Sequence, residues 1–172
     1  MSEALERYQA HLRQWSDIQG HLPRLFDLAQ GAVLELGVRS GVSTSAFLAG
    51  VESHGGQVWS IDHNPDCAAV FKEHPLWHFV YADSEDKQVA YTAGIPCPLD
   101  LLFIDTEHTY EKTRRELLAW MPLVRSGGRI LLHDTDDGLT FPGVRRAIHE
   151  ICGFTRMYWL YPESAGLGEI LC

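Results

Sequence analysis

The sequence has little positive charge, and that charge is scattered. It carries 14 lysines and arginines against 23 acidic residues, which gives a formal net charge of −9, and its longest basic runs are the pairs Arg114-Arg115 and Arg145-Arg146. Binding to a polyanion requires clustered positive charge that neutralises phosphates. We therefore expect no nucleic-acid partner.

Cysteine pairs and long apolar runs are also missing. The 4 cysteines show no C-x-x-C spacing, which argues against a zinc knuckle or a redox dithiol and predicts reduced thiols. No apolar run approaches the length that crosses a bilayer, and the start of the chain, Met1-Ser-Glu-Ala-Leu-Glu-Arg, lacks the basic and apolar regions of a signal peptide. We expect no membrane partner and a cytoplasmic location.

The chain is long and apolar enough to bury one substantial core. Its 172 residues are 45% hydrophobic, which predicts a single domain over 1–172. Residues 1–30 are predicted to form a helical lead-in, because Leu5, Tyr8, Leu12 and Trp15 share one helical face and a second short helix follows near 22–28. The core is predicted to occupy residues 31–172.

From residue 32 onward, short apolar runs alternate with helical stretches, which indicates repeated β-α units and a mainly parallel sheet. We expect strands at 32–37, 57–61, 77–81, 99–105 and 128–133, and helices at 43–51, 65–73, 85–92, 109–121 and 142–151. Two final strands, at 155–161 and 168–171, have too short a connection for a parallel crossover. The predicted fold is α/β and Rossmann-like: a doubly wound, mainly parallel seven-stranded sheet that ends in an antiparallel hairpin.

A glycine turn follows the first predicted strand. It has the form E-x-G-x-x-x-G over Glu35 to Gly41, which lacks the second close-approach glycine of a dinucleotide site. Asp62 follows at about the separation from which a carboxylate reaches ribose hydroxyls. It lies too far before the next helix to cap it, and Asn64 is the better cap. Asp83 and Ser84 end the third strand, where capping the next helix and binding a ligand are equally favoured.

These segments resemble the motifs of class I S-adenosylmethionine-dependent methyltransferases. The stretch from Val33 to Gly41 is similar to that family's first motif, Ser60-Ile-Asp62 to its second, and Asp83-Ser84 to its acidic turn. The resemblance implies S-adenosylmethionine as cofactor. It implies that the cofactor-binding residues are Glu35, Gly37 and Gly41 at the methionine end, Ser40 in the same turn, Asp62 at the ribose, and Asp83 with Ser84 at the adenine.

A narrower resemblance lies in the segments 101–111 and 120–134, which look like the small bacterial cephalosporin-hydroxylase-like and macrocin O-methyltransferase-like group. Many of those are magnesium-dependent O-methyltransferases, and Asp105 and Asp134 match their metal-ligand positions. His133 stands where many relatives carry an acidic residue, and as a ligand it would suit manganese, iron or zinc better than Mg²⁺. The alternative is a solvated acidic loop at Asp134, Asp136 and Asp137, with His133 hydrogen-bonded inside the sheet.

His108 is predicted to be the general base, with Asp105 as its catalytic neighbour. It follows Asp105 by three residues at a strand-to-helix turn, and an imidazole can take up a hydroxyl proton near neutral pH. The alternative is a first-turn residue paired with Glu107 or Glu111. The sequence thus predicts methylation of a small-molecule hydroxyl, with or without a divalent metal.

Two other functions fit parts of this pattern. A non-catalytic nucleotide-binding or cofactor-binding module of the same fold would leave Asp105 and His108 idle. An iron oxygenase is disfavoured, because no H-x-D or H-x-E pair with a distant third histidine is evident. The short lead-in indicates either a small acceptor or a homodimer in which a second subunit closes the pocket.

Overall fold

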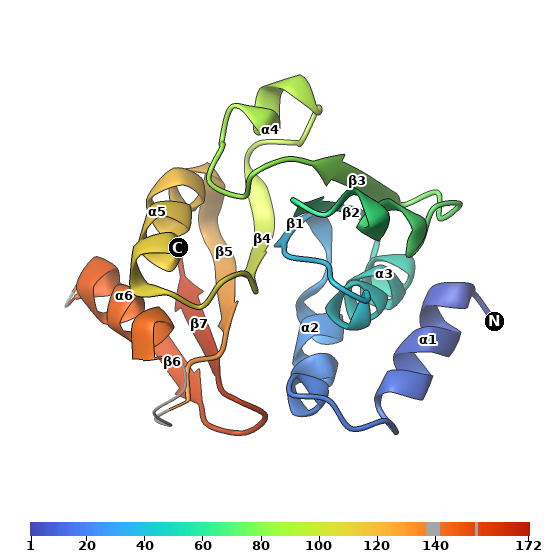
Figure 1. Ribbon diagram of the computed structural model, residues 1–172, viewed down its shortest axis with the longest axis horizontal. Coiled ribbons are helices and arrows are strands. Elements are labelled where there is room, and N and C mark those ends of the chain that lie inside the picture. The colour runs from blue at the N-terminus through green and yellow to red at the C-terminus, as the bar shows by residue number, and fades with distance from the viewer. Residues whose placement is uncertain (137–141, 154) are drawn as a thin grey trace.

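The computed structural model describes residues 1–136, 142–153 and 155–172. Its centre is a seven-stranded sheet with the order β3-β2-β1-β4-β5-β7-β6 (Figure 1). The strands are β1 (Gly31–Leu36), β2 (Gly56–Asp62), β3 (Trp77–Tyr81), β4 (Leu99–Ile104), β5 (Val124–His133), β6 (Tyr158–Tyr161) and β7 (Leu167–Leu171). The pairs among β1 to β5 are parallel, whereas β7 pairs antiparallel with both β5 and β6. The predicted fold class, including the closing hairpin, is confirmed.

Helices cover both faces of this sheet, with α1 to α3 on one side and α5 and α6 on the other (Figure 1). The helices are α1 (Glu3–His11), α2 (Leu22–Leu28), α3 (Val42–His54), α4 (Val89–Thr92), α5 (Tyr110–Trp120) and α6 (Pro142–Cys152), with 3-10 turns η1 (Gln19–His21), η2 (Pro65–Ala69) and η3 (Met121–Leu123). Alternate strand residues face opposite layers: Val33 packs with the first set, and Leu34 and Leu36 with the second. Burial on both faces is why these strands are almost continuously apolar.

The chain order in the sheet reverses between β1 and β4. From β1 the sheet continues through β2 to β3 in one direction and through β4 to β5 in the other. Ligands of open α/β sheets bind outside the carboxyl ends of the strands at such a switch point. The turns after Leu36 and Ile104 therefore lie where a ligand site is expected.

Two predicted helices are much shorter than expected. The helix expected at 65–73 is the 3-10 turn η2, which Asn64 caps through the Asp66 N–H as anticipated. The helix expected at 85–92 is reduced to the single turn α4. There, Asp83 accepts from the Glu85 N–H and Asp86 from the Gln88 N–H, and such local side-chain bonds compete with helix formation.

Two other boundaries also differ. The strand expected at 128–133 begins earlier, at Val124, and its register against β4 shifts between Leu99 and Leu101, where Gly127 in β5 has φ 76°. The first helix ends at His11, so Trp15 lies outside it and is 85% exposed. Thr109 caps α5, because its side chain accepts a hydrogen bond from the Lys112 N–H. Asp137, part of the alternative acidic loop, lies outside the described residues. Among the described helices, none is long and apolar enough to span a bilayer.

Candidate active site

The glycine turn and the end of β4 are in close contact. Gly37 has φ 94°, and a Cβ placed on it would lie 2.0 Å from the Asp105 carbonyl oxygen. Gly41 caps α3 with φ 80°, and its Cβ would lie 2.3 Å from Val70 Cγ1. Both glycines therefore combine a left-handed backbone with an approach that a side chain would prevent. The turn lies directly against the segment that carries Asp105.

Asp62 ties the glycine turn to the end of β2. Its Oδ2 accepts from the Val38 N–H at 2.8 Å and the Arg39 N–H at 3.3 Å, and its Oδ1 accepts from the Asn64 N–H at 2.8 Å. Burial alone would raise the pKa of Asp62, but the hydrogen bonds from these backbone groups outweigh it and hold the pKa below its usual range. Asp62 is thus a fixed anion at the edge of the switch point.

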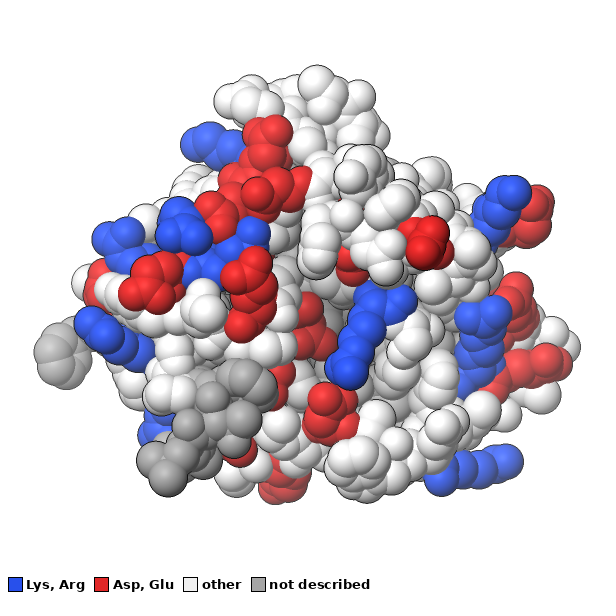
Figure 2. Space-filling view, in the orientation of Figure 1, with Lys and Arg blue, Asp and Glu red and all other residues white. Residues whose placement is uncertain are grey.

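A cavity of about 630 Å³ opens along the carboxyl ends of β1 to β4. Four predicted cofactor residues line it, namely Gly37, Asp62, Asp83 and Ser84. Its volume lies within the range of small-molecule and cofactor sites. Figure 2 shows the same face of the molecule as Figure 1, with positive and negative side chains interspersed around its middle. The structure brings these four residues to one cavity.

Glu35 lies elsewhere. It is fully buried beneath the glycine turn and is not among the residues that line the cavity. Its carboxylate accepts from Ser43 Oγ at 2.6 Å, Thr44 Oγ1 at 2.8 Å and Ser60 Oγ at 2.6 Å. Burial raises the pKa of Glu35 to about 7, although the three hydroxyl donors act in the opposite direction. Through these three hydrogen bonds, Glu35 connects β1 to α3 and to β2.

A second cavity of about 460 Å³ adjoins the first. The lead-in segment 14–18 and the glycine turn form its walls, and Ser40 lies here rather than in the larger cavity. Val38, Arg39 and Asp105 line both cavities. The two spaces therefore meet at the junction of the glycine turn and the end of β4.

A cluster of charged and ionisable groups lies at this junction. His108 Nδ1 is 3.0 Å from Asp134 Oδ2 and 4.0 Å from Asp105 Oδ1. Asp105, His108 and Asp134 each offer a ligand atom, and these atoms all lie within 4.8 Å of one another. The structure thus unites residues from the ends of β4 and β5. Such a cluster can take up a proton or hold a cation.

His133 lies beside this group. Its Nδ1 lies 2.9 Å from Asp134 Oδ2 and 3.5 Å from Asp105 Oδ1, and its Nε2 lies 3.0 Å from the Ser164 carbonyl oxygen. Both nitrogens face acceptors, so both carry hydrogen. Burial would lower the pKa of His133, but the bonds to the two carboxylates raise it to about 10. The residues whose ligand atoms lie together are Asp105, His108 and Asp134 and do not include His133, whose role as a metal ligand stays a prediction.

The same imidazolium acts on Asp134. Burial would raise the pKa of this carboxyl, but the hydrogen bond and positive charge of His133 outweigh it and hold the pKa below its usual range.

His108 and Asp134 both have left-handed backbones, with φ 58° and 59°, and so does Arg39 with φ 52°. Non-glycine residues in this region cost about 1–3 kcal/mol each and concentrate at functional sites.

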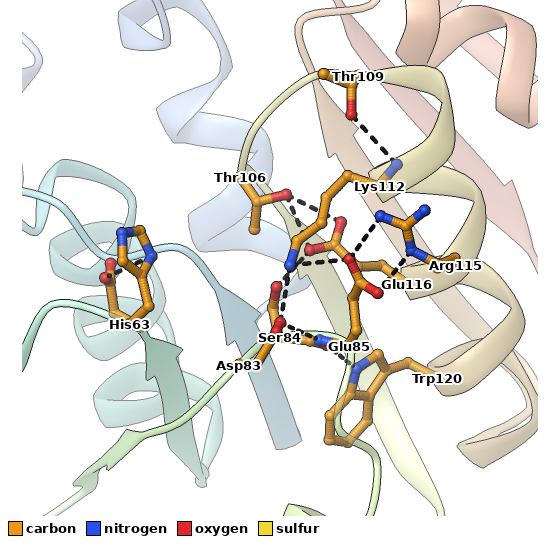
Figure 3. Close-up of polar contacts among 11 residues, drawn as sticks. His63, Asp83, Ser84, Glu85, Thr106, Thr109, Lys112, Arg115, Glu116 and Trp120 are labelled. Carbon is orange, nitrogen blue, oxygen red and sulfur yellow. Dashed lines mark hydrogen bonds and ion pairs between the residues drawn. The ribbon is translucent and has the colours of Figure 1, made fainter.

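Sequence reasoning missed Lys112. Its Nζ lies 2.8 Å from Asp83 Oδ1 and 3.1 Å from Glu85 Oε1, at the wall of the larger cavity (Figure 3). Burial would lower the pKa of Lys112, but the hydrogen bonds to Asp83 and Glu85 raise it. The sequence feature that could have identified Lys112 is its position in the first turn of α5, the helix that follows the strand end with Asp105.

Beside Lys112 lies the fully buried Glu116. Its carboxylate accepts from Ser84 Oγ at 2.5 Å and from Thr106 Oγ1 at 2.9 Å. Burial raises the pKa of Glu116 to about 7, although both hydroxyls oppose the shift. The Ser84 hydroxyl is therefore directed toward α5, while its residue still borders the cavity.

Known methyltransferases share this fold. The chain resembles an O-methyltransferase from Bacillus cereus in complex with S-adenosylhomocysteine (SAH), at 17% identity and a TM-score of 0.68 over 100% of this chain and 92% of that chain. It resembles MycE of the mycinamycin biosynthetic pathway, in complex with Mg, SAH and mycinamycin VI, at 18% identity and a TM-score of 0.70 over 99% of this chain and 54% of that chain. A candidate rRNA methylase from Clostridium thermocellum is similar at 14% identity and a TM-score of 0.65, over 92% of this chain and 98% of that chain.

The sheet order and the cavity at its switch point are those of class I S-adenosylmethionine-dependent methyltransferases, the class that the sequence predicted. Residues 34–135 match the family model of a methyltransferase domain, and the chain belongs to that family. The matched segment runs from β1 through the end of β5 and includes Asp62, Asp105, His108 and Asp134.

Proposed function

We propose that this protein transfers the methyl group of S-adenosylmethionine to a hydroxyl of a small molecule. The observation that carries the proposal is the position of Asp105, which lines both cavities and lies in one cluster with His108 and Asp134. A donor in the larger cavity and an acceptor in the smaller one would meet at this cluster. By likeness of fold, the O-methyltransferase from Bacillus cereus supports a hydroxyl acceptor, and MycE, which has mycinamycin VI bound, supports a small-molecule acceptor.

The larger cavity fits the donor in one orientation. From the switch point toward β3, the cavity is lined first by Gly37 and Asp105, next by Asp62 at the end of β2, and last by Asp83 after β3. This order matches the methionine, ribose and adenine parts of the donor. Asp62 lies on the wall of this cavity, where its carboxylate is an acceptor for hydrogen bonds from ribose hydroxyls.

His108 acts as the general base. When bound, the donor supplies a methyl group on a positively charged sulfur. As the acceptor oxygen bonds to the methyl carbon, the carbon–sulfur bond breaks with its electron pair going to sulfur, and the hydroxyl proton passes to His108. Nδ1 faces the Asp134 carboxylate and carries a hydrogen, so proton uptake takes place at Nε2. The carboxylate stabilises the imidazolium that forms.

Calorimetry tests donor binding. We expect S-adenosylmethionine and SAH to bind at submillimolar concentration, and NAD to bind more weakly. Transfer of a labelled methyl group to a panel of phenols and sugars, followed by mass spectrometry of the products, then identifies the acceptor. Binding of NAD with no binding of either sulfur ligand would overturn the proposal.

A second candidate gives the cluster a divalent metal. Two carboxylates and one imidazole within 4.8 Å fit such an ion, with Asp105, His108 and Asp134 as ligands. A bound metal would lower the pKa of the acceptor hydroxyl. His108 would then be a ligand rather than the base, so the two candidates are exclusive.

Chelation separates the two candidates. Under the metal candidate, dialysis against EDTA abolishes methyl transfer, added Mn²⁺ restores it, and calorimetry detects Mn²⁺ binding to the wild type but not to Asp134→Asn. An unchanged rate after chelation would leave His108 acting as the base without a metal.

A further inference from the structure

A buried lysine borders the larger cavity, and the proposed proton transfer makes no use of it. Lys112 has a side chain only 11% exposed, and lysines are rarely buried unless they are paired. Its ammonium contacts two carboxylates, Asp83 and Glu85, that come from the loop after β3 (Figure 3). Helix α5 is thereby connected to the far end of the cavity.

The contact fixes one oxygen of Asp83. Oδ1 accepts from Lys112 Nζ at 2.8 Å and from the Glu85 N–H at 3.0 Å. Within the described part of the chain, no group donates a hydrogen bond to Oδ2. The Asp83 side chain is 66% exposed and lies on the cavity wall. Asp83 is therefore held on one side and keeps an acceptor for a ligand on the other.

Removal of the ammonium would release this arrangement. Asp83, Glu85 and Glu116 all lie near the Lys112 ammonium, and like charges repel. Arg115 pairs with Glu85 at 2.6 Å, so Glu85 keeps a partner without Lys112. Asp83 would keep the single backbone bond from Glu85, and its exposed side chain would be free to rotate.

We propose that Lys112 is a positioning residue of the donor site, which holds the Asp83 carboxylate so that its second oxygen accepts a hydrogen bond from the exocyclic amino group of adenine. The inference rests on the proposed function, because it requires the donor's adenine to occupy this cavity. A purine ring without the amino group offers this oxygen no hydrogen and should bind less tightly.

The test compares SAH with its analogue that carries unsubstituted purine in place of adenine, which lacks the amino group, keeps N1 as an acceptor and leaves the net charge unchanged. Effects of Lys112 on overall charge therefore cancel in the ratio of the two affinities. We expect the wild type to prefer SAH at least about tenfold, as for a hydrogen bond to a charged group. Lys112→Met should weaken SAH binding about tenfold and reduce the preference below about threefold, whereas Lys112→Arg should retain most of it.

Two controls make the result specific. Arg115→Ala removes a charge from the same helix but leaves the contact between Lys112 and Asp83, so the preference should persist. Asp83→Asn should reduce the preference in the same way as Lys112→Met. Where Lys112→Met does not fold, Lys112→Gln takes its place in the comparison.

Two outcomes count against the inference. An unchanged preference in Lys112→Met would overturn it, whether both ligands bind as tightly as to the wild type or both are weakened equally, which indicates a merely structural role; in either case the proposed function stands. Failure of the wild-type protein to bind SAH at all would overturn the proposed function together with this inference.

Discussion

At the scale of single residues, the most direct prediction concerns His108. We expect His108→Ala to lower kcat about 10²- to 10⁴-fold on the acceptor identified in the screen, because removal of a general base has effects of this size. SAH affinity should change less than about threefold, because His108 is not among the residues that line the larger cavity. The measurements are steady-state kinetics and calorimetry.

A matched control for this variant is His149→Ala. His149 lies in α6 and bonds the Tyr158 hydroxyl, so its loss should leave kcat unchanged. If His108→Ala retained more than half of the wild-type kcat, His108 would not be the base.

Glu35 leads to a prediction about pH. Its pKa is raised to about 7 in the folded protein, so between about pH 4.5 and 7 the folded state binds more protons than the unfolded state. Stability contributed by protonated Glu35 is therefore present below this window and is lost as the pH rises through it. Glu35→Gln cannot ionise at this position. We therefore expect its free energy of unfolding, minus that of wild type, to be about 1–3 kcal/mol larger at pH 8 than at pH 4.5.

Urea denaturation of both proteins across this pH range measures the difference. Glu116 has a similarly raised pKa, and Glu116→Gln provides an independent second case. A stability difference between Glu35→Gln and wild type that is the same at both pH values would show that Glu35 keeps an ordinary pKa.

At the scale of elements, the sequence predicted the strands better than the helices. The buried parallel strands are short apolar runs that few other structures fit, so β1 to β4 lie close to their expected positions. The loops after β2 and β3 are different, because side-chain bonds from Asn64, Asp83 and Asp86 replaced helix with tight turns. Helical periodicity contains no information about such competition.

Site prediction had a similar limit. Residues that directly follow strand ends, such as Asp62 and Asp105, were found because parallel strands bring their carboxyl ends together. Lys112 was missed because its role depends on how α5 packs against the loop after β3. The charge of His133 was missed because it depends on how the carboxylates of Asp105 and Asp134 lie around its ring, which the order of residues along the chain does not give.

The glycine turn can be tested as an element. Gly37→Ala would place a Cβ 2.0 Å from the Asp105 carbonyl oxygen, which forces the turn away from β4. We expect SAH affinity, measured by calorimetry, to fall more than about tenfold. The control is Gly55→Ala at the end of α3, where φ is 86° but a Cβ would meet nothing within 4 Å.

Both variants incur the cost of about 1–3 kcal/mol for a non-glycine residue in a sparsely populated backbone conformation with positive φ. Gly55→Ala should therefore lower the Tm without changing SAH affinity. Similar affinity in Gly37→Ala and wild type would show that the close approach to β4 does not shape the donor site.

At the scale of the whole molecule, the fold does not determine the acceptor. The similar structures share this fold, but they comprise an O-methyltransferase, an enzyme with mycinamycin VI bound and a candidate rRNA methylase. The acceptor must therefore be selected by parts outside the sheet. Under the proposed function, a candidate for that part is the lead-in segment 14–18, which forms one wall of the smaller cavity.

Hydrogen exchange would locate the donor on the whole molecule. Saturating SAH should slow amide exchange in the four strand-end turns 37–41, 62–64, 82–85 and 105–107, because a ligand across the switch point excludes water from them and reduces local opening. Exchange in β6 and α6 should be unchanged, because neither element contributes a residue to the larger cavity. Protection centred on β6 and β7, with none at the glycine turn, would place the donor away from the switch point and contradict the proposed orientation.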